Sequence, residues 1–460
     1  ASKRPSRQIW KSVGVPQGLS AIEGKLRTKQ LDAVASDRRL RKLTARSNEF
    51  DAKSSAKSKE KTMEITHTHP NILREVIEAK QSLKSTPAGG QRRSAKIAST
   101  KRETAIVYCE GNFAKLDGKT ANGLVRHSQA YRILSVIDSD HEGKDSGQVL
   151  DNLTNHIPVF GDLEAAVVHE MTTPDTLIYG MAPSDGKLSV EDRRVVLDAI
   201  SLGMNIVSGL HEYLGDDPEI ASAAQIGNVT IRDLRKPRPS KEMRLFDGSV
   251  GNVKAIRIAV LGTDCAIGKR TTATVLAREL NALGIKTVLV GTGQTGLMQG
   301  AKYGVAMDAV PPQFCCGELE GAIVAASVGE NPDVILIEGQ GALSHPAFCT
   351  SAFILRGSQP NAVILQHAPK RTHRCDFPNM AMPDPSDEIA LIEAFADTKV
   401  IGLTINHEGM TDAEVAAAIT SYSRRLHLPV TDALSRPAAY LTELVLAALP
   451  GLRRIPVAAA

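Results

Sequence analysis

The sequence predicts an α/β chain in which two domains, each a parallel sheet within a three-layer arrangement, follow a basic N-terminal segment. From residue 104 onward, short β-branched runs alternate with helical stretches, as they do in β-α-β units around a parallel sheet. The length of 460 residues is about three times the ~150 residues of an average domain, so it accommodates both domains and the extra segment. The net charge changes sign near residue 100, which separates that segment from the domains.

The overall composition excludes several classes of protein. Hydrophobic residues make up 42% of the chain and charged residues 23%, which is ordinary globular usage. No stretch approaches the roughly 18 apolar residues of a membrane-spanning helix, and no apolar region follows the N-terminal positive charges. We therefore expect a soluble, cytoplasmic protein without a membrane partner. The 6 cysteines form no C-x-x-C pair, so we expect reduced thiols and neither a disulfide framework nor a metal site.

Residues 1–100 are expected to be mostly disordered, with a helix around Pro70–Leu83. They hold 22 of the 55 Lys and Arg residues but only 9 of the 51 Asp and Glu residues. Such a composition buries too little apolar surface to offset the entropy of ordering. A solvated extension is the favoured interpretation, and a targeting peptide remains an alternative. An arm that binds nucleic acid or another polyanion is less favoured, because Trp10 and Phe50 are its only aromatics.

Residues 101–250 are expected to form a Rossmann-like domain. Its strands are predicted at Thr104–Cys109, Arg132–Ile137, Thr176–Gly180 and Asn205–Gly209, and its helices near Thr120–His127, Gly161–His169 and Val190–Leu202. The first strand runs into Glu110 and the second ends at Asp138, positions that lie near the phosphates and the ribose in such a unit. Because the full G-x-G-x-x-G is missing, a purely structural Asp138 fits equally well. A Pro- and charge-rich stretch at 233–241 reads as the inter-domain connection.

Residues 251–460 are expected to form a P-loop NTPase-like domain. A buried strand at Ile256–Leu261 leads into a glycine loop, a lysine and an amphipathic helix through Leu283. Glycines let backbone N–H groups turn toward phosphate oxygens, while the helix N-terminus and the lysine supply positive charge. The residues predicted to bind phosphate are Gly262, Thr263, Asp264, Cys265, Ala266, Ile267, Gly268, Lys269, Arg270, Thr271 and Thr272.

This loop departs from the usual P-loop in two ways. Five residues separate Gly262 from Gly268 instead of four, which matches the variant loop of dethiobiotin synthetase-like enzymes. Arg270 stands where a Ser or Thr hydroxyl normally ligates magnesium, and a guanidinium cannot coordinate a cation. Magnesium-nucleotide chemistry would therefore need Thr271 or Thr272. An arginine beside Lys269 favours a metal-free phosphate such as a pyrophosphate bridge.

Other strands of this domain bring polar residues to the same edge of the sheet. A buried strand ends at Glu338, which is placed as a Walker B-like acid or as a general base. The strand at 287–290 leads into a glycine turn that carries Gln294 and Thr295, with loop filler as the competing interpretation. The strand Ala362–Gln366 leads to His367 and a basic run. Within that run, Lys370, Arg371, His373 and Arg374 form a candidate carboxylate-binding patch, with a solvated basic loop as the competing interpretation.

Six segments of the chain resemble the D-glutamate N-acetyltransferase family. This two-domain group combines a Rossmann-like N-terminal domain with a dethiobiotin synthetase-like P-loop domain, and the resemblance covers about residues 104–450. The most specific segment is GTDCAIGKRTTA at Gly262–Ala273, with arginine after the lysine. The other segments are Tyr179–Pro183, Ser208–Glu212, Gly291–Gly296, Ile337–Leu343 and His367–Pro369.

The resemblance implies transfer of an acetyl group from acetyl-CoA to the amine of D-glutamate or a similar acidic amino acid. Coenzyme A carries phosphates without obligatory magnesium, which suits a loop with Arg270. The acceptor amine must lose a proton, and Glu338 is the first candidate base, followed by His345 and His367. The remaining roles are substrate binding by Lys370, Arg371, Arg374, Gln294 and Thr295 and oxyanion stabilisation by the Gln340 amide or nearby backbone N–H groups.

Two other functions stay open at this stage. The P-loop domain also resembles ATP-dependent dethiobiotin synthetase, so a Mg-ATP-dependent carboxylate-activating ligase or kinase is the alternative enzyme. A nucleotide-sensing protein whose basic segment docks a partner is the non-enzymatic alternative. In each case we expect a small-molecule ligand and a homo-oligomer, a dimer or higher, because P-loop proteins of this type often dimerise across the nucleotide site.

Overall fold

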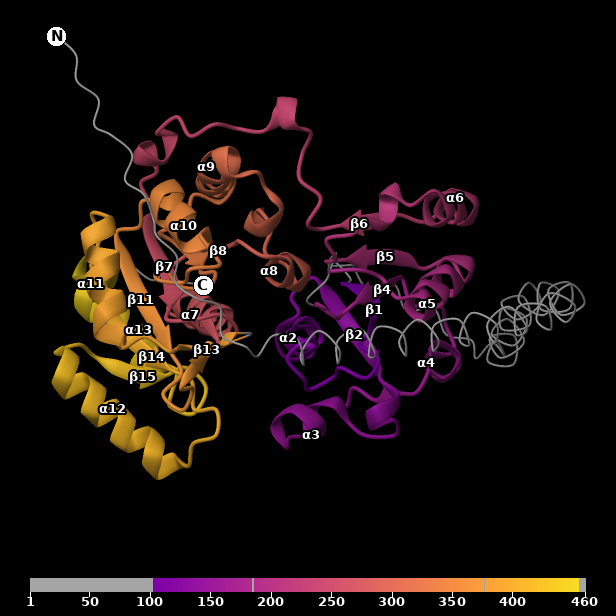
Figure 1. Ribbon diagram of the computed structural model, residues 1–460, viewed down its shortest axis with the longest axis horizontal. Coiled ribbons are helices and arrows are strands. Elements are labelled where there is room, and N and C mark those ends of the chain that lie inside the picture. The colour runs from indigo at the N-terminus through magenta and orange to yellow at the C-terminus, as the bar shows by residue number, and fades with distance from the viewer. Residues whose placement is uncertain (1–101, 184–185, 376, 455–460) are drawn as a thin grey trace, which may run out of the picture. The chain divides into compact units, whose positions relative to one another are not determined.

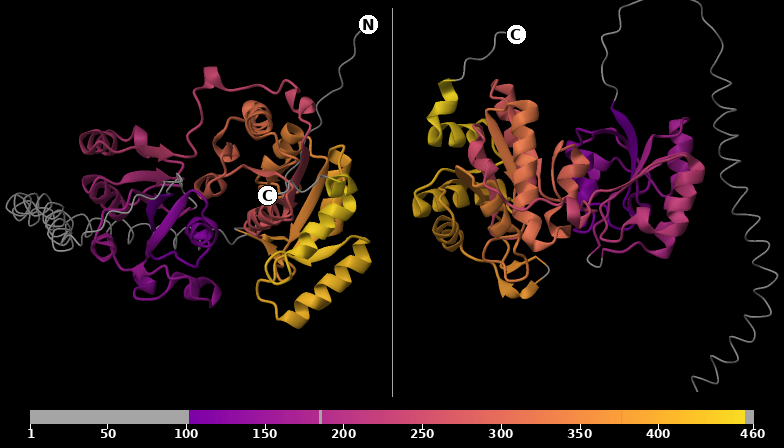
Figure 2. Two further views of the ribbon diagram at one scale, coloured as in Figure 1. Left: turned by 180° about the vertical axis from the view of Figure 1, so that it is seen from behind. Right: turned by 90° about the horizontal axis from the view of Figure 1, so that it is seen from above.

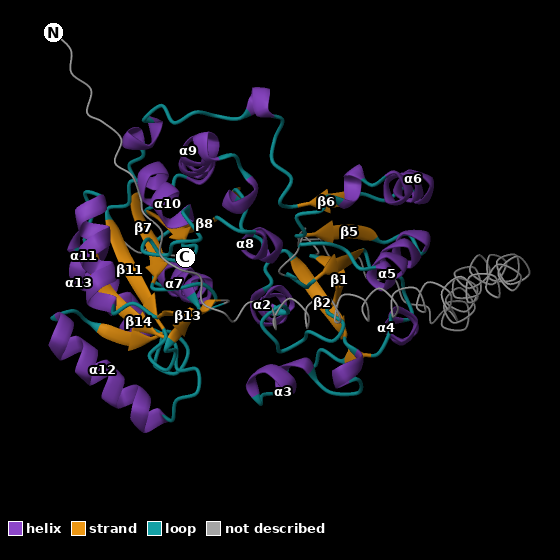
Figure 3. Ribbon diagram, viewed as in Figure 1, coloured by secondary structure: helices purple, strands orange, loops and turns teal. Residues whose placement is uncertain are grey.

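The computed structural model describes residues 102–183, 186–375 and 377–454. The basic segment 1–100, with the helix expected near Pro70–Leu83, lies outside the described residues. The described chain forms two parallel sheets flanked by helices, which confirms the α/β prediction (Figure 1; Figure 3). Over these ranges, no helix combines the length and the apolar character needed to cross a bilayer.

The first sheet has the strand order β3-β2-β1-β4-β5-β6 in the described chain, and each neighbouring pair is parallel. Its strands are β1 (Glu103–Tyr108), β2 (Tyr131–Ile137), β3 (Val159–Phe160), β4 (Thr176–Tyr179), β5 (Asn205–Ser208) and β6 (Ile231–Asp233). Its helices are α2 (Lys119–His127), α3 (Ser146–Asp151), α4 (Leu163–Glu170), α5 (Val190–Ser201) and α6 (Pro218–Gly227). The order reverses between β1 and β4, as in a Rossmann-like domain.

A buried acid ties the two central strands of this sheet to a helix. Tyr108 at the end of β1 and Tyr179 at the end of β4 donate their hydroxyls to the two carboxylate oxygens of Asp192 on α5, at 2.6 and 2.8 Å. Burial, followed by the proximity of Asp192, raises the pKa of both phenols, which keeps them protonated as donors. The carboxyl ends of β1 and β4 are therefore held in a fixed position.

The second sheet has the order β15-β14-β11-β7-β10-β8-β9 in the described chain, and again each neighbouring pair is parallel. Its strands are β7 (Ile256–Gly262), β8 (Thr287–Gly291), β9 (Tyr303–Gly304), β10 (Val334–Glu338), β11 (Ala362–His367), β14 (Val400–Ile405) and β15 (Val430–Asp432). A separate antiparallel hairpin consists of β12 (His373–Arg374) and β13 (Phe377–Ala381). The helices are α7 (Lys269–Ala282), α8 (Gln294–Gln299), α9 (Pro312–Glu330), α10 (Thr350–Ser358), α11 (Pro385–Phe395), α12 (Asp412–Leu426) and α13 (Ala439–Ala448).

Both faces of this second sheet are buried, as the helices on either side of it show (Figure 2). Along β10, Ile335 and Ile337 belong to a cluster with residues of α9 and α10, whereas Val334 and Leu336 belong to a cluster with residues of α7 and α13. Successive side chains of a strand point to opposite faces, so a strand that is covered on both faces must be apolar throughout. This explains why β10 reads as an uninterrupted apolar run that ends in one acid.

The connection between the two sheets lies against α9. Glu318 accepts hydrogen bonds from the Arg238 guanidinium at 2.5 and 2.6 Å and from the Arg244 backbone N–H at 2.6 Å. Glu320, two residues further along α9, accepts hydrogen bonds from two more backbone N–H groups of the connection. Gly317 permits this approach, because a Cβ there would lie 2.6 Å from a connection nitrogen and closer still to two other backbone atoms. The connection between the two sheets is therefore packed closely against α9.

Helices α2 and α8 join the first sheet's domain to the second. The Gln299 carbonyl at the end of α8 accepts the backbone N–H groups of Gln129 at 2.7 Å and Ala130 at 3.2 Å. At the start of α8, the Thr295 hydroxyl lies 2.9 Å from the Thr120 hydroxyl of α2. Residues that follow β8 in the P-loop domain are thus fixed by α2 of the Rossmann-like domain.

Candidate functional site

The predicted phosphate loop connects β7 to α7. Ala266 and Gly268 both have positive φ, at 49° and 102°, which bends the loop back over the N-terminus of α7. Gly268 precedes the helix and has no side chain to cover its first N–H groups. Gly262 is equally constrained, because a Cβ there would lie 2.9 Å from the Lys269 side chain and 3.0 Å from the Gln366 carbonyl. The geometry is that of a loop that receives an anion.

Lys269 is folded into this loop. Its ammonium donates to the Asp264 carbonyl at 2.5 Å, and the side chain is buried. Burial lowers the pKa of Lys269, while Cys265 and Asp264 oppose the shift. Because this cation binds a neutral carbonyl in a buried setting, an incoming phosphate would supply the charge that it lacks.

Arg270 points to the acid at the end of β10. Its Nε lies 3.6 Å from Oε1 of Glu338, and its Nη1 donates to the side-chain carbonyl of Gln299. The other Glu338 oxygen accepts the Thr292 backbone N–H at 3.0 Å. Burial raises the pKa of Glu338, and the Arg270 charge acts in the opposite direction. In a P-loop NTPase the residue after the lysine and a nearby acid hold Mg²⁺, whereas here a guanidinium lies beside that acid.

Thr271 and Thr272 are the two hydroxyls that could replace the missing magnesium ligand. Thr272 is buried and donates to the Gln366 amide oxygen at 2.6 Å, so it faces β11. The same Gln366 oxygen accepts the Thr404 hydroxyl at 2.5 Å. Thr271 is half-buried in the first turn of α7. Gln366 is a supporting residue that no sequence pattern had singled out.

Both candidate histidines are buried. His367 ends β11, and its Nδ1 lies 2.9 Å from the Thr263 hydroxyl in the loop. Burial lowers the pKa of His367 to about 4, so the ring is neutral and weakly basic at pH 7. His345 accepts the Ala347 backbone N–H at its Nδ1, 3.2 Å away, and its Nε2 lies 3.9 Å from Oδ1 of Asp264. His367 therefore contacts the loop through the Thr263 hydroxyl, and His345 lies next to the Asp264 carboxylate of the loop.

The basic residues after β11 do not converge on one patch. Lys370 pairs with Glu414 of α12 at 2.5 Å. Arg371 pairs with Glu408 at 2.7 Å and also donates to the Cys265 and Ala266 carbonyls of the loop. Arg374 is buried and donates to the Thr263 carbonyl at 3.3 Å and to the Ser344 hydroxyl at 2.8 Å, whereas His373 is exposed. The two arginines brace the phosphate loop, and each predicted carboxylate-binding cation already has partners.

The polar residues after β8 lie in a helix that the sequence did not predict. The glycine-rich run was expected to form a turn, but α8 begins at Gln294, so Gln294 and Thr295 occupy its first turn. Gln294 is buried and Thr295 bonds across to α2. Gln340 lies opposite this segment, since a Cβ on Gly293 would clash with its amide nitrogen.

The two acids that were expected near a nucleotide in the first domain each contact a neighbouring residue. Glu110 accepts the backbone N–H of Ser139 at 2.9 Å, and the Asp138 carboxylate lies 2.5 Å from Nδ1 of His141. These groups cluster at the carboxyl ends of β1 and β2, next to the reversal of strand order. Across the described ranges, no group of three or more His, Cys, Asp or Glu side chains is arranged to hold a metal ion.

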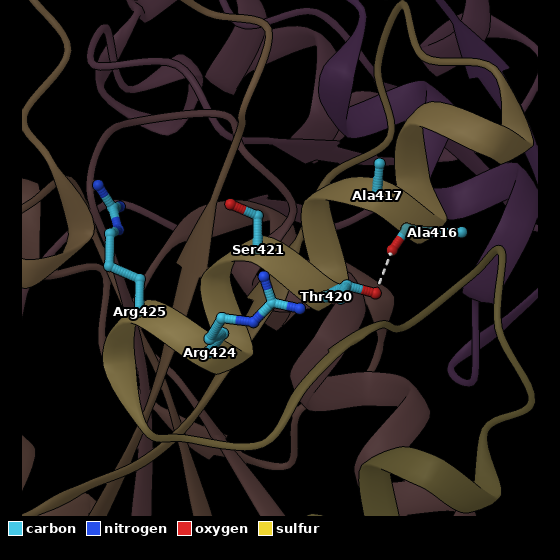
Figure 4. Close-up of a pocket in the computed structure, with 6 residues that line it drawn as sticks. All are labelled: Ala416, Ala417, Thr420, Ser421, Arg424 and Arg425. Carbon is cyan, nitrogen blue, oxygen red and sulfur yellow. Dashed lines mark hydrogen bonds between the residues drawn. The ribbon is translucent and has the colours of Figure 1, made fainter.

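Two hollows stand out. The larger, of about 620 Å³, is an open depression along α12 lined by Ala416, Ala417, Thr420, Ser421, Arg424 and Arg425 (Figure 4). Its residues all belong to one exposed helix, and Arg425 is paired with Asp384. The smaller, of about 180 Å³, lies beside Arg270 and is lined from both domains, with His127 from α2 and Gln299 from α8. Neither His127 nor Gln299 carried a sequence signal.

Two family models match the chain. The model described as the domain of unknown function (DUF1611_C) P-loop domain matches residues 244–442, and the one described as the (DUF1611_N) Rossmann-like domain matches residues 139–237. The first match spans the strands of the second sheet from β7 to β15, and the second spans β3, β4, β5 and β6 of the first sheet.

Curated and solved proteins agree with these matches. The chain is 33% identical over 274 residues to a protein named D-glutamate N-acetyltransferase from Tritonibacter scottomollicae, which is 58% of this chain and 80% of that protein. It is also 33% identical over 265 residues to a protein of the same name from a Pseudoalteromonas species, which is 56% of this chain and 77% of that protein. A crystal structure of a DUF1611 family protein from Anabaena variabilis superposes with a TM-score of 0.69 at 29% identity, and the match covers 75% of this chain and 100% of that one.

Proposed function

The chain belongs to the DUF1611 family, and from this premise we propose that it is an N-acetyltransferase that uses acetyl-CoA and acetylates the amine of D-glutamate or a similar acidic amino acid. The names of its two curated relatives support the general reaction. The donor, the acceptor and the role of the phosphate loop are our proposal.

The observation that carries the choice of donor is the position of Arg270 beside Glu338. Its Nε lies 3.6 Å from the carboxylate, so a guanidinium takes the place that Mg²⁺ takes in a nucleotide-hydrolysing P-loop. A positive charge is thus built into the protein. A donor whose phosphates need no metal fits this arrangement, and coenzyme A is such a donor.

In this proposal the loop binds the coenzyme phosphates. The backbone N–H groups between Gly262 and Gly268 and the N-terminus of α7 face the anion, and Lys269 exchanges the Asp264 carbonyl for a phosphate oxygen. Arg371 and Arg374 hold the loop carbonyls from behind and preserve its shape.

Glu338 is the proposed general base. Burial raises its pKa toward neutrality, which favours a carboxylate that must accept a proton from an ammonium. Glu338 takes one proton from the ammonium, and the amine nitrogen attacks the thioester carbonyl carbon. The carbon–sulfur bond then breaks as a second proton passes from the nitrogen to the sulfur, so the coenzyme leaves as a thiol. His367 is less suited, because its pKa of about 4 makes it a weak base. The backbone N–H groups of Gly339–Gly341 and the Gln340 amide are the proposed oxyanion donors.

The test measures thiol release from acetyl-CoA with D-glutamate, beside L-glutamate and beside phosphate release from Mg-ATP. We expect D-glutamate-dependent thiol release in wild type, a loss of at least 100-fold in Lys269→Ala, and little change in the control Lys399→Ala, an exposed lysine. Phosphate release without thiol release would contradict the proposal and favour a Mg-ATP-dependent ligase or kinase. Coenzyme binding without turnover of any acceptor would favour a sensor.

The role of Glu338 needs its own measurement. In a profile of kcat/KM against pH, Glu338→Gln should abolish the limb that reports the base, whereas His345→Gln should retain it. Unchanged turnover of Glu338→Gln at every pH would remove this residue as the base.

A further inference from the structure

The proposed acceptor carries carboxylates, yet the basic residues after β11 already have partners. Lys370 is paired with Glu414, Arg371 with Glu408 and two loop carbonyls, and Arg374 with Ser344 and a loop carbonyl. Binding a carboxylate there would first require these contacts to break. The receptor for the acceptor's carboxylate is therefore to be sought elsewhere.

We propose that the cavity beside Arg270 binds one carboxylate of the acidic amino acid acceptor, with His127 of the Rossmann-like domain and Gln299 as its other donors. The inference rests on the proposed function, because it names the place of the acceptor in the same reaction. The cavity, of about 180 Å³, is lined by these three residues and further by Lys302, Tyr303 and Glu330.

Two donors that line the cavity have no hydrogen-bond partner among the described residues. Nε2 of His127 and Nε2 of Gln299 are both buried, and neither has a hydrogen-bond partner within the described ranges. Gln299 is only 5% exposed, so its amide group is closed off from bulk water. A buried donor without a partner is unfavourable, and a ligand that accepts a hydrogen bond from it removes that cost.

Arg270 gives the cavity wall a positive charge. Arg270 gives one N–H to Gln299 and faces Glu338 with its Nε. A Cβ on Gly123 would lie 2.6 Å from Nη2 of Arg270 and nearer still to Nε2 of Gln299. Two donors on neighbouring groups therefore point to the same face of α2. A carboxylate offers about four lone-pair sites and can accept from several donors at once.

The protonation state of His127 is consistent with this role. Burial and then the nearby Arg270 charge lower the pKa of His127 to about 4. The ring is neutral at pH 7 and presents a single N–H, so it acts as a neutral donor beside the arginine. His127 thus adds a hydrogen bond without placing a second charge near Arg270.

The size and position of the cavity suit the carboxylate end of the amino acid acceptor. Pockets for drug-sized ligands span about 300–1,000 Å³, so 180 Å³ suits the carboxylate end of an amino acid and excludes a nucleotide. The Arg270 Nε is 3.6 Å from Glu338, the proposed base. An α-amino acid separates its amine from its carboxylate by one carbon. A carboxylate at Arg270 therefore brings the amine toward Glu338.

The site also gives the Rossmann-like domain a function. His127 lies in the last turn of α2, and the Gln129 and Ala130 N–H groups that follow hold the carbonyl of Gln299. The acceptor pocket is complete only with this contribution from α2. This differs from nucleotide binding at the reversal of strand order, where Glu110 and Asp138 engage Ser139 and His141.

Binding without turnover tests the inference independently of the reaction. Glutarate has the two carboxylates of glutamate and no amine, so it cannot be acetylated. We expect calorimetric titration to detect glutarate binding to the wild-type full chain, with Kd at least tenfold higher in His127→Phe and in Gln299→Met. Arg126→Ala, which removes the exposed charge next to His127 on α2, serves as the matched control and should leave Kd unchanged.

A further variant covers loss of folding in either single variant. Gly123→Ala keeps every donor but places a methyl group against Gln299 and Arg270, and it should also weaken glutarate binding. Glutarate binding that is equal in all variants, or absent from wild type, would overturn the inference. Binding of inorganic phosphate with the same dependence on His127 would also overturn it, because the site would then be a general anion site.

The outcomes separate this inference from the proposed function. Glutarate binding that depends on His127 together with no thiol release would keep the pocket and reject the acetyl transfer. Thiol release in which His127→Phe leaves the KM for D-glutamate unchanged would keep the reaction and reject the pocket. A raised KM for D-glutamate at constant KM for acetyl-CoA is the expected result.

Discussion

The buried pair of Arg270 and Glu338 should dominate the stability of the P-loop domain, and removing either partner should be costly. Glu338 is 4% exposed, and its second oxygen also accepts the Thr292 N–H. Removing one member of a buried pair costs about 3–5 kcal/mol, because the other charge stays buried and unpaired. For a domain of this size we expect each single variant to lower Tm by roughly 6–20 °C, at about 2–4 °C per kcal/mol.

The two single variants should differ in their response to pH. In Arg270→Met the orphaned Glu338 carboxylate can take up a proton, because burial raises its pKa and the opposing Arg270 charge is gone. Protonation then limits what the unpaired group costs. A raised pKa in the folded state means stability is lost as pH rises, so Arg270→Met should regain stability between pH 7 and pH 5. In Glu338→Gln the guanidinium cannot release its proton, so no such recovery is expected.

The assay is a double-mutant cycle of Arg270→Met and Glu338→Gln, followed by circular dichroism at pH 5 and pH 7. The double variant should lose at least 2 kcal/mol less than the sum of the single losses, because neither charge is left alone. Losses that add to within about 0.5 kcal/mol would refute the coupling. An equal loss at both pH values in Arg270→Met would refute the argument that Glu338 is the group left unpaired.

Three further predictions follow from other contacts. The His367 pKa of about 4 lies below its ordinary 6.5, so the unfolded chain binds more protons in this window, and His367 should account for a loss of about 3 kcal/mol of stability as pH drops from 6.5 to 4. In thermal unfolding, His367→Gln should remove this share of the pH dependence and leave the share of His127, whose pKa is lowered to the same value. Gly317→Ala should separate the inter-domain connection from α9 and speed limited proteolysis there, whereas Gly251→Ala, with no atom within 4 Å, should not. Arg270→Thr should restore the hydroxyl that ligates magnesium, so Mg-ATP should raise the Tm of this variant by several degrees and leave the Tm of wild type unchanged. No shift in the variant would show that position 270 is not what excludes the metal.

The sequence predicted the long elements of the fold well, because their signal is local. The strands β7, β10 and β11 are uninterrupted apolar runs, since helices cover both faces of the sheet. The short edge strands β3 and β9 have two residues each, too few for any periodicity. Helix α8 was predicted as a turn because glycine is a poor helix former. In the structure, Gly296 lets this helix approach Glu338, where a Cβ would clash with the carboxylate.

In the candidate site, too, the parts with a local sequence signal could be predicted and the contacts between distant residues could not. The phosphate loop is a continuous segment, so glycine spacing and the following lysine were enough to predict it. The partners of the basic run could not be predicted, because they are distant in sequence. Glu408 lies in the segment after β14, and Glu414 lies in α12. His127 lies 143 positions before Arg270, and a lone histidine in an amphipathic helix has no pattern that distinguishes it.

A single substitution in the loop links these features. With a hydroxyl at position 270, Glu338 would share a metal ion, and the space beside α2 would have no fixed charge. With Arg270, the cation is covalently part of α7, extends past Glu338 and reaches Gln299 at the end of α8. Gln299 is in turn held by the backbone after α2, where His127 lies. In the proposed reaction, the arginine that stands where a magnesium ligand normally lies therefore also supplies the charged wall of the proposed acceptor pocket.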